Sequence, residues 1–415
     1  VRRMRQPDVV VAGAGPGGLA AAAGLAQAGL RVVVLERQAE IGSPIRTSGG
    51  SFIADLTALG IPDSLFHPYR RARFVTPHEE AVFSYDPPRL CLLDVRRTFQ
   101  FLAERAVAAG AELRLATAAA APIVEEGRVV GVQTRGAADR SEELRCRVVV
   151  DATGYRAALL TQAGIGAPFR RFGVGVEYDL YAPAYDSEET VIVVGQQVAP
   201  AGYAWAGPWR QGRVRLGVGI IHPDSRADPR SYLDRLLATA PAFGLNLTGA
   251  QALELHHGLI PADGLRGRFV GHGLVAVGDA AGQASPVLGE GTRWALRGGR
   301  LAADVIIEAV AAGNVTATAL GRYERRWRAR YGASLRVAQW INEEIAAWTD
   351  EQWDEAARLL RRVSSAQMAH MLEGTAGPGV LLRVLATNPA LLTTGVKTVV
   401  ARLRREWLVE GSEGG

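Results

Sequence analysis

Short apolar runs and a helical pattern alternate at the start of the chain. Residues 8–12, which are apolar after Asp8, predict a buried parallel strand, and residues 16–28 predict an Ala-rich helix. A second strand is predicted at residues 31–35, which are apolar after Arg31, and it ends at Glu36. Parallel strands joined by a helix are covered on both faces, which is why they lack polar alternation. The pattern therefore predicts one β-α-β unit.

The same pattern continues over the next hundred residues. A further helix and strand are predicted at residues 96–109 and 112–116. Residues 122–134 alternate like a small antiparallel meander, and residues 145–150 predict a return to the parallel sheet. We expect the meander to be an insertion in a parallel sheet.

The pattern changes to polar and apolar alternation between residues 169 and 261, which predicts an antiparallel sheet with a helix at residues 229–240. An apolar strand at residues 274–277 and a long helix at residues 291–312 follow. From residue 316 the period is helical to the end, with a last helix expected from Pro389 to about Trp407.

Composition and charge narrow the class of protein. The 415 residues are 48% hydrophobic and 21% charged, as in ordinary globular proteins. The net charge is only +5 and no long basic run occurs, so no nucleic-acid partner is expected. Cys91 and Cys146 lie far apart, which favours a reducing, cytoplasmic setting and indicates no metal site. His256 and His257 lack ligand spacing and are expected to be structural.

A glycine-rich loop follows the first predicted strand and opens the first predicted helix. A tight turn requires glycine at Gly13, close approach of a pyrophosphate requires it at Gly15, and helix packing requires it at Gly18. The helix N-terminus favours the negative phosphates. Glu36, about 20 residues on, is placed to accept hydrogen bonds from ribose hydroxyls. This pattern predicts a dinucleotide site for FAD or NAD.

The far end of the chain favours FAD. The apolar strand at 274–277 ends in Gly278 and Asp279, and an aspartate there can accept hydrogen bonds from the ribityl hydroxyls that only a flavin has. Residues 286–292 then begin a helix whose backbone amides can face the pyrimidine edge of the flavin and stabilise negative charge on it.

Four motifs in this order resemble flavoproteins of the para-hydroxybenzoate hydroxylase fold: residues 13–18, residues 96–100, residues 151–154 and Gly278-Asp279. Within that group the chain is most similar to the geranylgeranyl reductase family over about residues 8–365. The specific element is residues 200–208, which is similar to the family's Tyr-x-Trp-x-Phe-Pro motif.

This resemblance implies reduction of isolated C=C bonds in an isoprenoid (geranylgeranyl-type) chain, with hydride from flavin N5 and a proton from a group in the site. Tyr203 and Trp205 point to the same face of a strand, where two aromatic side chains can line an apolar tunnel. No separate nicotinamide motif is visible, so the implied electron donor is NAD(P)H or a ferredoxin.

The chain departs from the family pattern at two places. Some members carry a cysteine in the loop after the second strand, where this chain has Thr47 and Ser48, so a thiol-dependent step is not expected. The motif's Phe is Gly207, which is expected to widen the pocket. By the resemblance, Arg46 is a flavin or substrate contact and Arg96 reaches the FAD phosphates.

The expected site has two groups of residues. The catalytic candidates are Tyr203, Trp205, Thr47 and Ser48. The cofactor-binding candidates are Gly13, Gly15, Pro16, Gly17, Gly18, Glu36, Arg37, Arg46, Thr47, Arg96, Ala152, Gly154, Gly278, Asp279, Pro286, Gly289, Gly291 and Thr292.

The predicted fold class is α/β, with a Rossmann-type FAD-binding domain, an antiparallel β-sheet substrate domain and a helical C-terminal region. We expect residues 1–168 and 262–315 in the FAD-binding domain, residues 169–261 in the substrate domain and residues 316–415 in the helical region.

Two other interpretations remain open. A flavin monooxygenase acting on an aromatic or polyketide-like substrate has the same scaffold, although residues 151–157 lack the Asp-Gly opening typical of NAD(P)H-binding hydroxylases. A non-catalytic flavin or isoprenoid-binding protein is the second. Apolar positions in 380–400 beside the basic residues 402–405 are suited to peripheral membrane contact, whereas no apolar run is long enough to span a bilayer.

Overall fold

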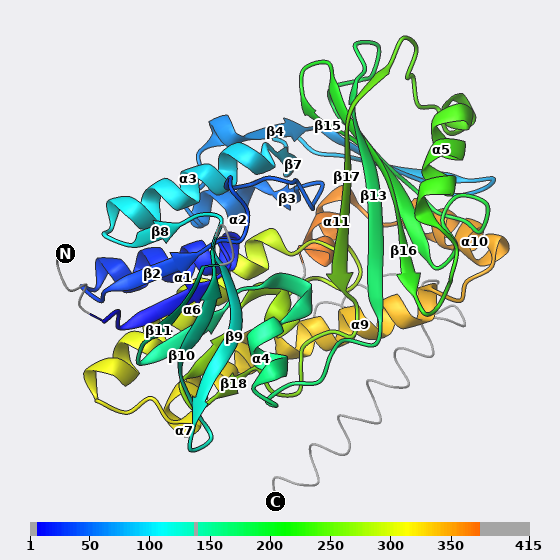
Figure 1. The fold of residues 1–415 in the computed structure, drawn as a ribbon. Coiled ribbons are helices and arrows are strands. Elements are labelled where there is room, and N and C mark those ends of the chain that lie inside the picture. Colours follow the sequence, from blue (N-terminus) through cyan, green and yellow to red (C-terminus); the bar gives the residue numbers. More distant parts are fainter. Residues whose placement is uncertain (1–5, 137–139, 374–415) are drawn as a thin grey trace, which may run out of the picture.

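The computed structural model describes residues 6–136 and 140–373. It holds two large sheets and a set of C-terminal helices (Figure 1). This confirms the α/β fold class with its antiparallel sheet and its helical C-terminal region, of which the described part ends at residue 373. The last helix expected at 389–407 and the apolar and basic positions at 380–405 lie outside the described residues.

The first large sheet contains the predicted β-α-β unit. Its six strands are, in order, β18 (Val270–Gly271), β19 (Leu274–Ala276), β12 (Val148–Asp151), β1 (Val9–Ala12), β2 (Val32–Leu35) and β8 (Glu112–Arg114). All neighbours pair in parallel except β18, which is antiparallel to β19. Every residue of β1, β2 and β12 is buried, which explains why their sequences are apolar except for Asp151 at the end of β12.

Small residues bring two helices close together beside this sheet. Helix α1 (Pro16–Gln27) contacts α6 (Thr292–Ala311) and α3 (Val95–Ala108) (Figure 1). A Cβ atom added at Gly299 would lie 2.1 Å from the carbonyl oxygen of Gly17, so the backbones of α1 and α6 touch at this point. The Ala- and Gly-rich composition of α1 therefore serves close packing.

A three-stranded antiparallel sheet is inserted before β12. Its strands are β11 (Ser141–Arg145), β10 (Arg128–Arg135) and β9 (Ala118–Glu125), and the short helix α4 (Ala158–Gln162) contacts both β9 and β12. The predicted return strand at residues 145–150 is wrong at its start. Residues up to Arg145 pair in the meander, and the parallel strand begins only at Val148 because Cys146 and Arg147 turn the chain between the two sheets.

The second large sheet has seven strands. They are, in order, β17 (Gln251–Pro261), β13 (Phe172–Tyr181), β16 (Arg213–His222), β15 (Gly202–Arg210), β14 (Glu189–Val193), β5 (Arg71–Val75) and β6 (Glu80–Ser84). Neighbours are antiparallel except β14 and β5. Two strands from residues 71–84 thus complete a sheet that the sequence indicated only for residues 169–261. Helix α5 (Pro229–Thr239) packs on its outer face (Figure 1).

Helices after residue 316 pack first on α6 and then on β6 of the second large sheet. They are α7 (Ala317–Leu320), α8 (Arg322–Trp327), α9 (Ala333–Ile345), α10 (Asp350–Leu360) and α11 (Ser365–Leu372). Capping boxes at Thr349 and Ser364 start α10 and α11. The buried Asp354 of α10 accepts hydrogen bonds from Thr76 Oγ1 at 2.5 Å and His78 Nδ1 at 2.8 Å, which fixes α10 to the turn between β5 and β6.

A small sheet contacts β15 of the second large sheet. Its strands are β3 (Gly50–Phe52), β7 (Leu90–Leu93) and β4 (Phe66–Tyr69), and the short helix α2 (Ile53–Ala58) follows β3. Phe52, Tyr69 and Leu92 of this sheet form one apolar cluster with Met368 of α11. None of the helices among residues 6–136 and 140–373 has the length and apolarity to cross a bilayer.

Candidate active site

The predicted cofactor residues meet at one edge of the six-stranded sheet. Strands β2, β1, β12 and β19 are parallel neighbours, so their carboxyl ends lie side by side. Glu36, Gly13, Ala152 and Gly278 come directly after or within two residues of these four ends. This is the edge at which open α/β sheets bind their ligands.

The glycine loop is tightly packed on one side and open on the other. Gly13 has a φ of +106°, and a Cβ atom there would lie 2.3 Å from the Ala152 carbonyl oxygen. A Cβ atom at Gly18 would lie 2.2 Å from the Gly13 carbonyl oxygen. At Gly15, by contrast, a Cβ atom would meet nothing within 4 Å. The open side is where the sequence places the pyrophosphate.

The start of α1 fits an anionic ligand. Gly15 is the N-cap and offers no side-chain cap, and Pro16 follows, so the amides of Gly17 and Gly18 have no capping partner. Glu36 accepts hydrogen bonds from the backbone N–H of Ala14 and of Gln38, each at 2.9 Å, which holds its carboxylate beside the loop. An uncapped helix start beside a fixed carboxylate fits the pyrophosphate and ribose of a dinucleotide.

The residues predicted for the flavin end also lie together. A Cβ atom added at Gly291 would lie 3.1 Å from Asp279 Oδ1, so the aspartate touches the start of α6, where Glu290 Oε1 accepts a hydrogen bond from the Arg293 N–H at 3.1 Å. Burial, with a further contribution from the negative charge of Glu290, raises the pKa of Asp279 to about 6. This carboxyl group and the helix N-terminus fit a ligand that carries both hydroxyl groups and an electron-rich ring.

The three predicted arginines differ in their surroundings. Arg37 is exposed, whereas Arg46 lines the central cavity described below. Burial and the positive charge of Arg37 lower the pKa of Arg46. Arg96 has ion pairs at 3.8 Å with Glu40 and with Glu254, and its buried Nε has no hydrogen-bond partner. A contact between Arg96 and FAD phosphates stays a prediction.

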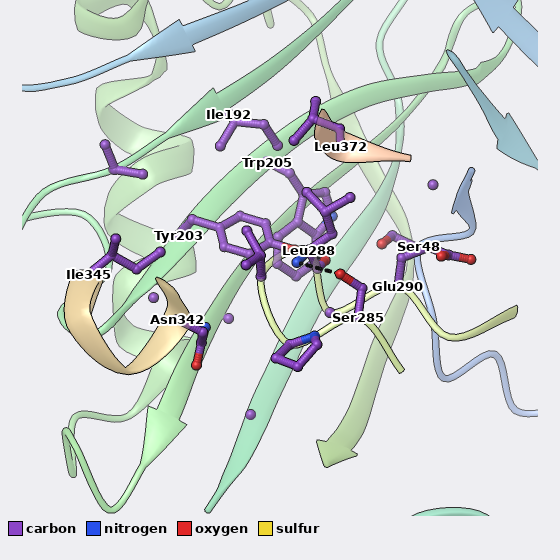
Figure 2. A pocket seen from close by; sticks show the side chains of 18 of the residues that line it. Ser48, Ile192, Tyr203, Trp205, Ser285, Leu288, Glu290, Asn342, Ile345 and Leu372 are labelled. Atoms are coloured by element: carbon purple, nitrogen blue, oxygen red, sulfur yellow. Dashed lines mark hydrogen bonds between the residues drawn. The ribbon is translucent and has the colours of Figure 1, made fainter. Parts of the chain in front are cut away.

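A large apolar cavity lies between the seven-stranded sheet and the C-terminal helices. Its volume is about 750 Å³. Figure 2 shows side chains from several elements around it: Ile192, Tyr203 and Trp205 from the sheet, Ser285 and Leu288 from the loop before α6, and Ile345 and Leu372 from α9 and α11. The loop residues Arg46, Thr47 and Ser48 line it too. Such a mostly apolar space with few polar groups is typical of a small-molecule site.

Tyr203 and Trp205 project into this cavity from the same face of β15, as the sequence predicts (Figure 2). Their ring centroids are 5.7 Å apart. The Tyr203 hydroxyl donates a hydrogen bond to the Leu288 carbonyl oxygen, and burial raises its pKa above the ordinary tyrosine value. Tyr203 therefore remains a neutral phenol that holds the loop before α6.

Glycines make room for the Trp205 ring. Cβ atoms added at Gly217 and Gly219 of β16 would lie 2.3 Å and 3.4 Å from atoms of this ring. The ring therefore lies flat across the neighbouring strand. Its Nε1 donates a hydrogen bond of 3.1 Å to Glu177 of β13.

The expected widening at Gly207 is not found. A Cβ atom at Gly207 would lie 3.1 Å from both Leu92 Cδ1 and Thr190 Oγ1. The neighbouring strand β7 places Leu92 in the space that a larger side chain would use. The missing aromatic ring is therefore compensated by packing from another sheet, which the local motif cannot reveal.

Thr47 and Ser48 both line the cavity, but among the described residues no acidic or basic side chain is hydrogen-bonded to either hydroxyl group. Thr47 Oγ1 accepts a hydrogen bond from the backbone N–H of Gly49 at 3.3 Å. The Ser48 carbonyl oxygen accepts one from the buried Arg215 guanidinium, which also donates to the Leu93 carbonyl oxygen at 2.9 Å. Arg215 thus fixes the backbone of this loop.

Sequence reasoning missed a set of buried charged residues on the cavity face of the sheet. Glu177, Asp179, Arg215 and His256 are each at most 5% exposed. They occupy alternate positions in strands whose other face is apolar, as with Glu177 and Asp179 between the apolar Val176, Tyr178 and Leu180. Charged residues at the inward positions of a predicted strand were the signal that was available.

A second missed cluster lies at the start of α6. Arg293 is completely buried and pairs with Glu290 at 2.8 Å and with Asp55 at 2.6 Å. Asp55 also binds Arg297. The pKa of Glu290 is raised by burial, against the opposing effect of Arg293. The cluster connects the predicted flavin loop to α2, far away in the sequence.

Comparisons with known proteins agree with this arrangement. Residues 8–171 match the family model "FAD dependent oxidoreductase", and residues 172–258 match "Geranylgeranyl reductase catalytic domain". A digeranylgeranylglycerophospholipid reductase of Methanothermobacter thermautotrophicus is 32% identical over 392 residues, which are 93% of this chain and 97% of that protein. One from Methanopyrus kandleri is 31% identical with the same coverage of both chains.

Solved structures show the same fold. A geranylgeranyl bacteriochlorophyll reductase-like protein from Thermoplasma acidophilum has a TM-score of 0.85 at 24% identity, covering 95% of this chain and 99% of that one. A flavin-dependent brominase has a TM-score of 0.70 at 18% identity, covering 89% and 94%. The fold alone therefore accommodates more than one flavin chemistry. By its sequence relatives, however, the chain belongs to the geranylgeranyl reductase family of FAD-dependent oxidoreductases.

Proposed function

We propose that this enzyme reduces C=C bonds of a geranylgeranyl-type isoprenoid chain. The observation that carries the proposal is the apolar cavity of about 750 Å³, which is bounded both by the predicted flavin loop and by α9, α10 and α11. An extended hydrocarbon needs a long apolar space that reaches the redox centre. The family relatives, two of them named digeranylgeranylglycerophospholipid reductases, support a lipid of this class.

The glycine loop and Glu36 would hold the ADP half of FAD, with Ala152 and Gly154 beside them. Asp279 and the residues from Pro286 to Thr292 would hold the ribityl chain and the ring. Bound in its reduced form, FAD supplies a hydride equivalent for the alkene. The electrons would come from NAD(P)H or a reduced ferredoxin.

The chain's own residues position the alkene and exclude water. Tyr203 and Trp205 would pack against the hydrocarbon, because their rings line the cavity and are held by hydrogen bonds to Leu288 and Glu177. Thr47 and Ser48 stand where the thiol of some relatives would be. A hydroxyl in this place passes on a proton only when another group supplies it.

The test is a single-turnover reaction without oxygen. Protein reduced with dithionite is incubated with geranylgeranyl compounds that carry a free hydroxyl, a diphosphate or a glycerol ether phosphate, and the products are weighed by mass spectrometry. We expect a gain of two hydrogens per reduced double bond. No gain with any of them contradicts the proposal, and a gain of one oxygen atom in air supports the monooxygenase interpretation instead.

A further inference from the structure

Three side chains form a hydrogen-bonded row across the cavity face of the seven-stranded sheet. His256 of β17 lies opposite Glu177 of β13 in the strand register. His256 Nδ1 is 3.0 Å from Glu177 Oε1, and His256 Nε2 is 3.0 Å from Glu254 Oε2. The imidazole therefore bridges two carboxylates, one through each ring nitrogen.

This row runs from the surface to the cavity. The side chain of Glu254 is 42% exposed, whereas those of His256 and Glu177 are 5% and 4% exposed. His256 and Glu177 both line the cavity. A proton taken up from solvent at Glu254 can thus reach Glu177 through a single imidazole without crossing an apolar layer.

The charges around the row favour a protonated imidazole. Burial lowers the pKa of His256, but the hydrogen bonds with Glu177 and Glu254 outweigh this effect and raise it above the ordinary value. Arg215 opposes them from β16, at 3.9 Å from Glu177, and Arg96 of α3 lies 3.8 Å from Glu254. The hydrogen bond with His256 also lowers the pKa of Glu254.

Alkene reduction consumes a proton that no identified group supplies. One carbon takes the hydride from reduced flavin, the π bond breaks, and the other carbon must take a proton, which gives the saturated bond and oxidised flavin. The loop that carries a thiol in some relatives has Thr47 and Ser48 here. Whichever group gives this proton to the alkene must therefore be reprotonated by a group that is more acidic than a hydroxyl.

We propose that Glu254, His256 and Glu177 form a proton path that delivers this proton from solvent to the cavity. The proposal rests on the reductase function proposed above. His256 gives its proton toward Glu177 and the cavity and is reprotonated through Glu254. The Trp205 indole, bound to Glu177 at 3.1 Å, orients the inner carboxylate beside the substrate position.

The test compares amide variants at both ends of the path. Glu254→Gln keeps the shape of the exposed end and is decisive, because Glu177→Gln also removes the carboxylate nearest to the buried Arg215. Glu143→Gln, an exposed carboxylate on β11 outside this sheet, is the matched control. Flavin reoxidation in single turnover is followed from pH 6 to 9, in water and in deuterium oxide.

We expect the wild-type rate to fall as pH rises through the pKa of His256, since the protonated form is the donor. Glu254→Gln should slow reoxidation about tenfold and His256→Gln about a hundredfold, with unchanged substrate affinity. Glu254→Gln should also move the pH profile to lower pH, because it removes a carboxylate that raises the pKa of His256. Glu143→Gln should resemble wild type.

A measurement without turnover completes the test. The His256 ring is titrated by nuclear magnetic resonance in the oxidised holoprotein, and its pKa should be above 6.5 in wild type and lower in Glu254→Gln. Equal rates and pH profiles for wild type, Glu254→Gln and His256→Gln, or an imidazole that titrates at or below 6.5, would overturn the path. If wild type itself adds no hydrogen, the proposed function fails, and the path fails with it.

Discussion

The two large sheets carry polar chemistry in different places. In the six-stranded sheet the strands β1 and β2 are wholly apolar, and polar residues lie at or just after the strand ends, as Asp151 ends β12 and Glu36 follows Leu35. In the seven-stranded sheet Glu177 and His256 lie within the strands, on the cavity face. A parallel sheet covered on both faces has little room for such groups except at its strand ends, whereas an antiparallel sheet offers one face to a ligand. The difference predicts different responses to substitution.

The largest effect is expected from Arg215→Met. This change leaves the buried Glu177 without the guanidinium that connects it to the loop at Ser48, whereas Asp179 keeps its ion pair with Arg213 at 2.9 Å. Removing one partner of a buried ion pair costs about 3–5 kcal/mol of unfolding free energy, measured by chemical denaturation. Adding Glu177→Gln should recover part of the loss. If Arg215→Met alone is as stable as wild type, the buried charges of this sheet are not coupled.

Gly18→Ala tests the packed side of the glycine loop. The new Cβ atom would lie 2.2 Å from the Gly13 carbonyl oxygen, so we expect a loss of up to about 3 kcal/mol and of bound FAD. Gly15→Ala is the matched control, because its Cβ atom would point into open space. It should leave the unfolding midpoint of the apoprotein unchanged and weaken FAD binding. Equal stability losses in both variants would contradict a loop that is packed at Gly18 and open at Gly15.

Gly217→Ala tests tight packing against a glycine in the seven-stranded sheet. Its Cβ atom would lie 2.3 Å from the Trp205 ring and 2.8 Å from Glu177 Cβ, so the ring must move. We expect a loss of about 2 kcal/mol of unfolding free energy, with a change in tryptophan fluorescence. The matched control is Gly173→Ala in β13, on the same face of that strand as Glu177. Its Cβ atom would lie 3.8 Å from Ile260, an ordinary contact, so we expect no loss of stability. A neutral Gly217→Ala would show that the ring does not lie flat across β16.

The smallest effect concerns pH. The pKa of Asp279 is about 6, so its carboxyl group is mostly protonated at pH 5 and mostly ionised at pH 7. If the ionised form accepts the ribityl hydrogen bonds, FAD affinity of the apoprotein should rise about tenfold between these values, measured by flavin fluorescence. Asp279→Asn should remove the dependence. A wild-type affinity independent of pH would exclude this role for Asp279.

The parallel sheet was more predictable than the antiparallel one. The strands at 8–12 and 31–35 and the helix at 16–28 were predicted within about one residue, because their apolar runs and glycine spacing are local signals. The strands β5 and β6 were not, since β5 joins the sheet by pairing with β14, which lies more than a hundred residues away. Pairing partners of that kind leave no local pattern.

In the site, too, some features could be predicted from neighbouring residues and others could not. The aromatic pair Tyr203 and Trp205 could be placed on one face from their spacing alone. The outcome at Gly207 could not, because Leu92 arrives there from β7. His256, expected to be merely structural, lies between two carboxylates because the register of β13 and β17 sets Glu177 opposite it.

The amino-acid sequence by itself determined the dinucleotide loop, the flavin-end Gly278-Asp279 and the family, since each is written in residues that are neighbours along the chain. Only the tertiary structure decided what shares the cavity. Helices α9, α10 and α11 close it, and four strands bring Trp205, Glu177, Arg215 and His256 into one layer. The physical reason is that strand register and helix docking depend on burial summed over distant segments, which no short stretch of sequence specifies.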